Sequence, residues 1–123
     1  MTHQLSSSLE GGLLKVQVRG TLDPKRTPEM VQQVWQWVQQ PGVKALLVDI
    51  RTLEGRSSLS ETYFNIRNYP SAGIRLRTAV LELPENMDRA SFHDTAAGNL
   101  GFNIRHFDNE AAALAWLAEV LGD

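Results

Sequence analysis

Ser91, His93 and Asp94 are the residue types of a hydrolytic triad, and they lie within four positions of one another. Such a triad works when the serine, histidine and aspartate are joined in a line of hydrogen bonds. Successive residues of a helix diverge by about 100°, so a helix that carries all three does not align them. The sequence also has no Gly-x-Ser-x-Gly motif. We therefore interpret these residues as the polar outer face of a helix, and we predict no catalytic residue.

His106 and Asp108 lie two positions apart and could share one side of a strand, where His93 or His3 could join them as metal ligands. The chain has three histidines, none in a His-x-x-x-His pair, and no cysteine. It contains neither a Gly-x-Gly-x-x-Gly nor a Walker sequence. The sequence therefore predicts no bound metal and no cofactor.

Ser57 and Ser58 follow Arg56 at the predicted start of a helix, and two interpretations are open. Ser58 and Glu61 have the spacing of a capping box, and such a cap contributes about 1 kcal/mol. Alternatively, Ser57 or Ser58 is a phosphoacceptor. A phosphate there would lie at a helix amino terminus beside Arg56, which is electrostatically favourable.

The hydrophobic pattern of the first half predicts a hairpin, a helix and a central strand. Residues 5–9 and the alternating residues 14–18 are two strands joined by a glycine turn. Thr27 is predicted to cap a helix that ends near Gln40, with a buried stripe at Val31, Val34, Trp35 and Val38. The nearly continuous apolar run 44–50 is typical of a strand covered on both faces.

The second half predicts alternating helices and strands. A helix opens at Ser58 and carries Leu59, Tyr63 and Ile66 on one face, and residues 78–83 form a strand. A helix over 86–100, a strand over 102–107 and a last helix through Leu121 follow. The order ββαβαβαβα predicts an α/β fold with a mixed, mostly parallel sheet of about five strands and flanking helices.

Composition indicates one globular domain over residues 1–123, with 42% hydrophobic and 21% charged residues. No apolar run approaches the ~20 residues that a membrane helix needs, and the first residues do not resemble a secretion signal. We therefore expect a cytoplasmic protein without membrane insertion.

A net charge of −2 argues against nucleic-acid binding. Between positions 51 and 77 five arginines oppose two glutamates, namely Arg51, Arg56, Arg67, Arg75 and Arg77 against Glu54 and Glu61. We interpret them as scattered surface charge, with an anionic partner as the alternative.

Several aromatic residues are difficult to hide in one small core. Trp35 and Tyr63 fall on predicted core stripes, whereas Trp37, Phe64, Tyr69 and Trp116 do not all fit there. We predict a ligand pocket or a subunit interface at these four residues and Arg56. The last helix has no polar residue from 111 to 118, so either the domain covers it on more than one side or a second subunit does.

A family resemblance rests on fold-defining positions from about Leu13 onward. They are the run 46–50 with Leu53, Glu54 and Gly55, then Ala97, Asn99, Gly101 and Phe107, and the closing run 110–117. In these positions the chain resembles the STAS/SpoIIAA-like family, some of whose relatives resemble CRAL-TRIO lipid-transfer modules. The resemblance implies a non-enzymatic domain that binds protein partners, nucleotides or apolar ligands.

In the anti-sigma factor antagonist branch of that family, a phosphorylatable serine lies in an Asp-Ser-Ser type sequence after the central strand. Arg56-Ser57-Ser58 occupies this place here, with arginine in place of the acid and Leu59 in place of the next glycine. The leading hypothesis is a non-catalytic regulatory module that acts through a protein partner or a homodimer. The second is a carrier of a small apolar or amphiphilic, lipid-like ligand. A small hydrolase is the third, since carboxylates such as Asp49 and Glu82 could meet in the fold.

Overall fold

The computed structural model describes residues 3–70 and 76–122. Within these residues, six strands form one sheet: β1 (His3–Glu10), β2 (Leu13–Thr21), β3 (Ala45–Asp49), β4 (Leu53–Glu54), β5 (Arg77–Leu81) and β6 (Ile104–Phe107). The same ranges contain four α-helices: α1 (Thr27–Val38), α2 (Leu59–Arg67), α3 (Met87–Asn99) and α4 (Glu110–Leu121). No helix in the described part is long and apolar enough to cross a membrane.

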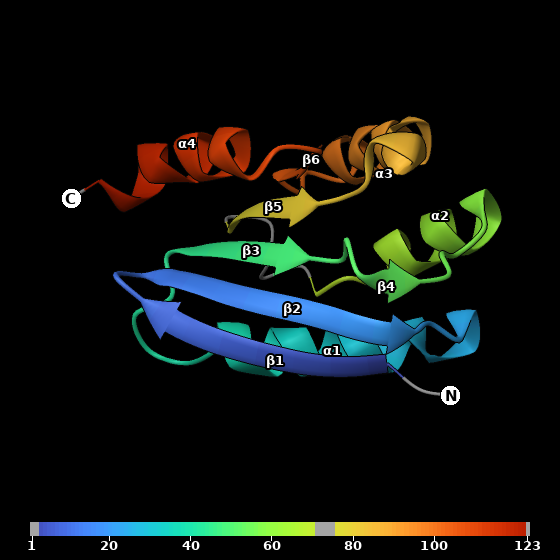
Figure 1. Cartoon of the computed structure of the whole chain (residues 1–123), viewed down its shortest axis with the longest axis horizontal. Coiled ribbons are helices and arrows are strands. Elements are labelled where there is room, and N and C mark those ends of the chain that lie inside the picture. The colour runs from blue at the N-terminus through green and yellow to red at the C-terminus, as the bar shows by residue number, and fades with distance from the viewer. Residues whose placement is uncertain (1–2, 71–75, 123) are drawn as a thin grey trace.

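The strands lie in the order β1-β2-β3-β5-β6, so neighbours in the sheet follow one another along the chain (Figure 1). β1 and β2 form an antiparallel hairpin, and β2, β3, β5 and β6 pair in parallel. This arrangement confirms the predicted mixed, mostly parallel sheet with β3 in its middle. β4 is not predicted by the sequence; it pairs with the end of β2 through Gly20 and Leu53. A strand of two residues has no hydrophobic period to detect.

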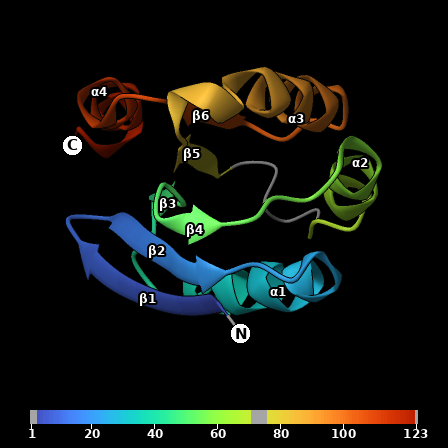
Figure 2. The ribbon, with the colours of Figure 1, turned by 45° about the vertical axis from the view of Figure 1, so that its right-hand side comes forward.

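The helices are divided between the two faces of the sheet. Each parallel connection advances to the next strand in the same direction, and right-handed connections then place their helices on one face. Figure 2 shows α1, α2 and α3 on one side of the sheet and α4 on the other. We call these sides the three-helix face and the α4 face.

Strand residues alternate between the two faces and form two buried clusters. The α4 face joins small and aliphatic side chains of β3, β5 and α4: Ala45, Leu47, Ala79, Leu81, Ala113 and Leu117. The three-helix face carries a cluster centred on β2, with Leu14, Val16, Val18, Leu22, Leu46 and Leu53. The core therefore lies on both sides of β3, which explains its continuous apolar sequence.

The start of α1 differs from the prediction that Thr27 caps it. Thr27 is the first residue of the helix, and Arg26 before it makes no side-chain cap. A 3-10 turn, Pro24–Arg26, runs directly into α1, and Asp23 caps this turn by accepting a hydrogen bond from the Lys25 N–H. The buried Thr27 hydroxyl is instead free to bond elsewhere in the fold.

The buried face of α2 also differs from the prediction. Of the predicted stripe, Ile66 is buried, whereas Leu59 and Tyr63 are 49% and 47% exposed. The side chains that α2 turns inward include Thr62 and Asn65, which line a cavity. A polar residue is tolerated beside a cavity but not in a closed core. The apolar pattern of α2 alone therefore predicts the wrong inner face for this helix.

Helix α4 packs on the sheet through one side. Ala113 and Leu117 are fully buried. The opposite side exposes Val120 and four alanines, namely Ala111, Ala112, Ala115 and Ala118. Alanine is the best helix former and exposes little apolar area. Within the described residues, the prediction that the domain itself covers more than one side of α4 is therefore wrong, and cover by a second subunit stays a prediction.

Candidate functional site

A cavity of about 250 Å³ lies between the three-helix face of the sheet and helices α1, α2 and α3. Apolar side chains of α1 and the strands make most of its wall: Met30, Val31, Val34, Trp35, Val38, Val18, Leu46, Val48, Val80 and Ile104. Two polar groups of residues border it. We call them the Asp94 cluster (Tyr69, His93, Asp94 and His106) and the Arg56 cluster (Arg56, Glu82 and Asn86).

Short side chains of the central strands lie on one side of the cavity, and helix α1 lies on the other. Val48, Thr78 and Val80 of the central strands are among the short floor residues, and the predicted α1 stripe lies opposite. Val34 and Trp35 of that stripe are half-buried rather than buried. The amphipathic pattern of α1 therefore faces a cavity, and the core-packing prediction for Trp35 is wrong.

The Asp94 cluster joins α3 to β6. Asp94 Oδ1 lies 2.7 Å from Nδ1 of His106 and 3.3 Å from Nδ1 of His93. Asp94 Oδ2 accepts a hydrogen bond of 2.8 Å from the His106 backbone N–H. The Tyr69 hydroxyl lies 3.0 Å from Nε2 of His93, and the two histidine rings pack edge to face with centroids 4.9 Å apart.

The charges of these residues follow from burial and hydrogen bonding. Burial alone would raise the pKa of Asp94, but the hydrogen bonds from His106 and His93 outweigh it and lower this pKa to about 2. Burial lowers the pKa of His93, which favours the neutral ring. Burial and the nearby Asp94 charge raise the pKa of Tyr69 to about 12, so its hydroxyl keeps its proton.

These charges define the direction of the hydrogen bonds. An ionised carboxylate only accepts, so Nδ1 of His93 and of His106 carries the proton that faces Asp94. A neutral His93 then has an unprotonated Nε2, and Tyr69 donates its proton to it. Tyr69, His93 and Asp94 are thus joined by two hydrogen bonds in series, with the buried Tyr69 hydroxyl as the first donor.

The cluster corrects the interpretation of His93 and Asp94 as an outer polar face. Ala90 and Ala97 of α3 are buried, and His93 and Asp94 complete the same inner stripe at i, i+3, i+4 and i+7. Ser91 lies outside this stripe and is exposed. Two alanines at this spacing were the signal that could have identified the inner face.

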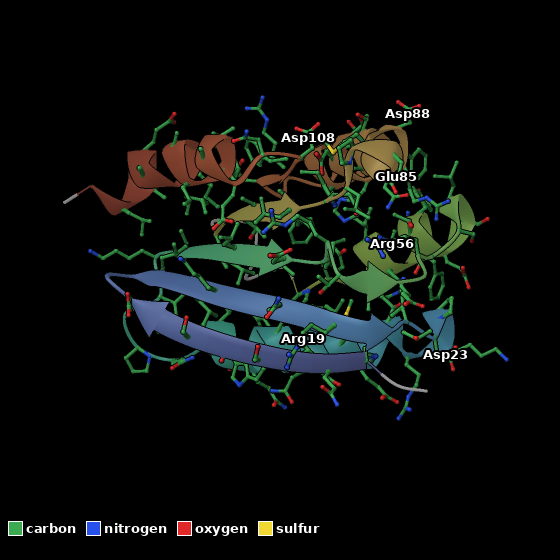
Figure 3. The ribbon with its side chains drawn as sticks, in the orientation of Figure 1. Arg19, Asp23, Arg56, Glu85, Asp88 and Asp108 are labelled. Carbon is green, nitrogen blue, oxygen red and sulfur yellow. The ribbon has the colours of Figure 1, made fainter. Side chains whose placement is uncertain are left out.

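The other predicted partners of the histidines lie elsewhere. Figure 3 shows Asp108 at the outer border of the molecule, and its side chain is exposed. His3 begins β1, at the opposite edge of the sheet from His106 on β6. The structure therefore brings His93 and His106 together with Asp94, and it brings neither Asp108 nor His3 to them.

The Arg56 cluster is a buried ion pair at the ends of the central strands. Figure 3 labels Arg56. Nε and Nη2 of Arg56 donate to the two carboxylate oxygens of Glu82, each at 2.8 Å. Its remaining bonds go to the backbone carbonyls of Ile50, Leu53 and Gly55, at 2.9, 2.6 and 2.7 Å. The five bonds match the five N–H donors of a guanidinium.

Glu82 is correspondingly well satisfied. It also accepts from the Leu83 N–H at 2.8 Å and from the Asn86 amide at 3.2 Å. Burial would raise the pKa of Glu82, but the hydrogen bonds from Arg56, Leu83 and Asn86 lower it. The carboxylate is therefore ionised and held in place.

The two candidate phosphoacceptors differ in their surroundings. Ser58 is the exposed N-cap of α2: its hydroxyl accepts from the Glu61 N–H at 3.1 Å and Glu61 accepts from the Ser58 N–H at 2.8 Å. Ser57 is half-buried at the cavity, with its hydroxyl 3.3 Å from that of Thr27 and its carbonyl accepting from Arg89 at 2.6 Å. The capping box is confirmed, and Ser58 is the more accessible hydroxyl.

The four aromatic residues predicted at a pocket or interface separate into different places. Tyr69 lines the cavity, whereas Trp37 packs against the buried cluster centred on β2. Trp116 lies on the α4 face, where its ring packs on Phe107 and under the Arg77 guanidinium at 4.7 Å. Phe64 is 65% exposed on α2. They do not form one site.

The local excess of arginine is mostly neutralised. Arg51 pairs with Asp49 at 2.8 Å and with Glu110 at 3.2 Å, Arg77 pairs with Glu119 at 2.8 Å, and Arg56 pairs with Glu82. The bond from Arg51 lowers the pKa of Asp49, and this carboxylate caps the loop after β3. Arg75 lies outside the described residues. Asp49 and Glu82 each bind their own arginine, so they do not act as a pair.

Comparison with known proteins supports the fold. The sequence matches no family model and no curated protein. Among solved structures, the chain is similar to an anti-sigma factor antagonist from Mycobacterium paratuberculosis, with a TM-score of 0.60, 18% identity and 94% of each chain covered. An uncharacterized DUF3478-family protein with a SpoIIAA-like fold from Shewanella loihica gives a TM-score of 0.55 and 19% identity over 94% of this chain and 93% of that one.

A third similar structure is the Bacillus cell fate determinant SpoIIAA in its phosphorylated form. It gives a TM-score of 0.53 and 16% identity over 94% of this chain and 99% of that chain. The likeness over 94% of the chain, together with the mixed sheet and its flanking helices, defines a STAS/SpoIIAA-like fold, as the sequence predicts. At these identities the likeness establishes the fold alone.

Proposed function

We propose that the chain is a non-catalytic regulatory module that binds a protein partner through the exposed face of α2. The observation that carries this proposal is three large apolar side chains left in solvent on one short helix. Leu59, Tyr63 and Phe64 are 49%, 47% and 65% exposed. Large apolar groups that gather on a surface mark interaction sites more often than scattered ones do.

Two further observations support a binding role. The similar structures include an anti-sigma factor antagonist, which by its name acts on a protein. Two carboxylates at the cavity, Glu82 and Asp94, are already ionised acceptors of several protein hydrogen bonds. Their arrangement favours a structural role for them over a catalytic one.

A pair of tagged variants in the native host tests this proposal. Phe64→Ser removes the most exposed of the three side chains, and Gln36→Ser, on the exposed side of α1, is the matched control. We expect a protein that is retained by the wild type and Gln36→Ser and lost with Phe64→Ser. The purified partner should bind Phe64→Ser at least about tenfold more weakly, as for an interface hot spot. Equal binding by both variants would contradict the proposal.

A phosphate switch at Ser58 or Ser57 and a homodimer through α4 are parts of this proposal that need their own measurements. Ser58 is exposed at the amino terminus of α2, next to Leu59, so a phosphate there would change the charge beside the proposed partner surface. Intact mass and native mass of protein from its own cells measure both features. An unmodified monomer under all growth conditions would argue against both.

A second candidate function is a carrier of a small apolar or amphiphilic ligand. The cavity of about 250 Å³ is close to the lower limit of about 300 Å³ for ligand pockets, and its wall is mainly apolar. Its polar borders at Tyr69, His93 and Arg56 suit an amphiphile better than a pure hydrocarbon.

A cavity-filling variant tests the carrier hypothesis. Val80→Phe places a ring in the cavity, and Val120→Phe adds the same ring on the exposed side of α4. We expect native mass spectrometry to detect a co-purified small molecule in the wild type and in Val120→Phe, and none in Val80→Phe. A bare wild type that also fails to bind a fluorescent fatty acid would reject this function.

A further inference from the structure

We infer that His93, Asp94 and His106 form a binding site for a divalent transition metal of the zinc class, in the wall of the cavity between α3 and β6. The side chains are 13%, 23% and 9% exposed, so the site is largely screened from solvent. This inference does not depend on the proposed protein partner.

The ligand atoms already face one another. One atom from each of the three residues lies within 4.8 Å of the others. Asp94 Oδ1 is 2.7 Å from Nδ1 of His106 and 3.3 Å from Nδ1 of His93. Two ligands that bind zinc tetrahedrally at about 2.0–2.1 Å lie roughly 3.3 Å apart. Small movements of the rings are therefore enough to place an ion between these atoms.

Two imidazoles and one carboxylate are also the right chemistry. Imidazole nitrogen suits zinc, copper, iron and nickel, whereas magnesium and calcium prefer oxygen ligands. With three protein ligands, a tetrahedral ion keeps one position for a water or for a group entering from the cavity. His93 and His106 both line the cavity, so that position is within reach of a bound molecule.

The surrounding bonds orient the ligands as in metal sites. Metal-binding histidines almost always donate their second ring N–H to a fixed acceptor. Tyr69 Oη lies 3.0 Å from Nε2 of His93 and can take this role. Asp94 Oδ2 is held at 2.8 Å by the His106 backbone N–H, which leaves Oδ1 for the ion.

Metal binding needs only an exchange of tautomers. In the metal-free cluster Nδ1 of each ring donates to Asp94. When the metal binds Nδ1, a neutral ring carries its proton on Nε2 instead, so His93 donates to Tyr69 and the direction of that hydrogen bond reverses. The proton that moves from Nδ1 to Nε2 stays on its ring, and the Asp94 carboxylate keeps its charge.

Cobalt(II) titration of the purified full chain tests the site. We expect one Co²⁺ per chain with the visible absorption of a four-coordinate ion, displaced by Zn²⁺. His106→Gln should abolish this absorption, and Tyr69→Phe should weaken binding by about 10–100-fold, as the loss of an outer partner does. His3→Gln is the matched control and should bind as the wild type does. Absent absorption in the wild type, or binding that survives in His106→Gln, would overturn the inference.

Ring nitrogen NMR of the wild type keeps the test independent of variant folding. On adding Zn²⁺, the Nδ1 signals of His93 and His106 should take metal-bound shifts while their Nε2 atoms become protonated. Zn²⁺ that leaves these four signals unchanged would overturn the inference even if His106→Gln does not fold.

Discussion

The Arg56 guanidinium binds both carboxylate oxygens of Glu82 at 2.8 Å, and the two side chains are only 13% and 4% exposed. This bidentate pair connects the chain after β4 to the end of β5. It also gives Arg56 a structural role. Arg56, which lies beside the candidate phosphoacceptors, therefore donates all five of its side-chain hydrogen bonds to Glu82 and to three backbone carbonyls.

Removing Arg56 should destabilise the fold strongly. Arg56→Ala leaves the Glu82 carboxylate buried without its counter-ion, which typically costs about 3–5 kcal/mol. Urea denaturation at pH 7 measures this loss. The double variant Arg56→Met with Glu82→Leu removes both charges and should be more stable than Arg56→Ala. A single variant as stable as the wild type would show that the pair is not buried as described.

Asp94 should make stability depend on pH at the acidic end. Its pKa is about 2 in the folded chain against 3.8 in a model peptide, so the unfolded chain binds more protons between these values. The stability that its ionised form contributes is present above the unfolded pKa and is lost as the pH falls through the folded pKa.

The comparison of wild type and Asp94→Asn from pH 7 to pH 2 measures this contribution. At neutral pH we expect the wild type to be more stable by about 2 kcal/mol, as for hydrogen bonds to a charged group. The difference should shrink as the pH falls below 3.8, the ordinary pKa of an aspartate. A difference that stays constant down to pH 2 would contradict the assigned bonds.

The cap of α2 should be worth a modest free energy. Ser58→Ala removes the acceptor of the Glu61 N–H and should cost about 1 kcal/mol by thermal or chemical unfolding. Ser60→Ala, at the next exposed serine of the same helix, should change stability by less than about 0.5 kcal/mol. Equal effects of the two variants would be inconsistent with the capping box.

Truncation should lower stability strongly on the inner side of α2 and hardly at all on its outer side. Ile66 is 1% exposed, so Ile66→Ala should cost about 2–5 kcal/mol. Phe64 is 65% exposed, so Phe64→Ala should stay within about 0.5 kcal/mol of the wild type. Guanidinium denaturation of both variants checks that α2 buries Ile66 and exposes Phe64; two variants of equal stability would contradict this orientation.

Apart from the two-residue β4, the strands could be predicted because each has a strong local signal. Leu14, Val16 and Val18 alternate, and the apolar run of β3 is covered on both faces. The capping box at Ser58 is equally local, since both partners lie within one helical turn. Such features need no knowledge of the rest of the fold.

The candidate sites could not be predicted in the same way. His93 and Asp94 meet His106 only because α3 packs on β6, and Arg56 meets Glu82 across 26 positions of the chain. The inner sides of α2 and α3 carry polar residues, which hydrophobic patterns assign to solvent. Residues that face a cavity can be polar. The spacing of apolar residues therefore does not identify the inner side of a helix where the candidate sites lie.

The spatial order of the strands has a consequence for synthesis. Because β2, β3, β5 and β6 follow one another both in the chain and in the sheet, each emerging strand can add to an edge that already exists. His106 lies on β6, which is the last strand to be added among the described residues. A nascent chain halted before β6 would hold most of the sheet but lack one wall of the cavity. Loading of any ion or small molecule there would then have to follow translation of α3 and β6.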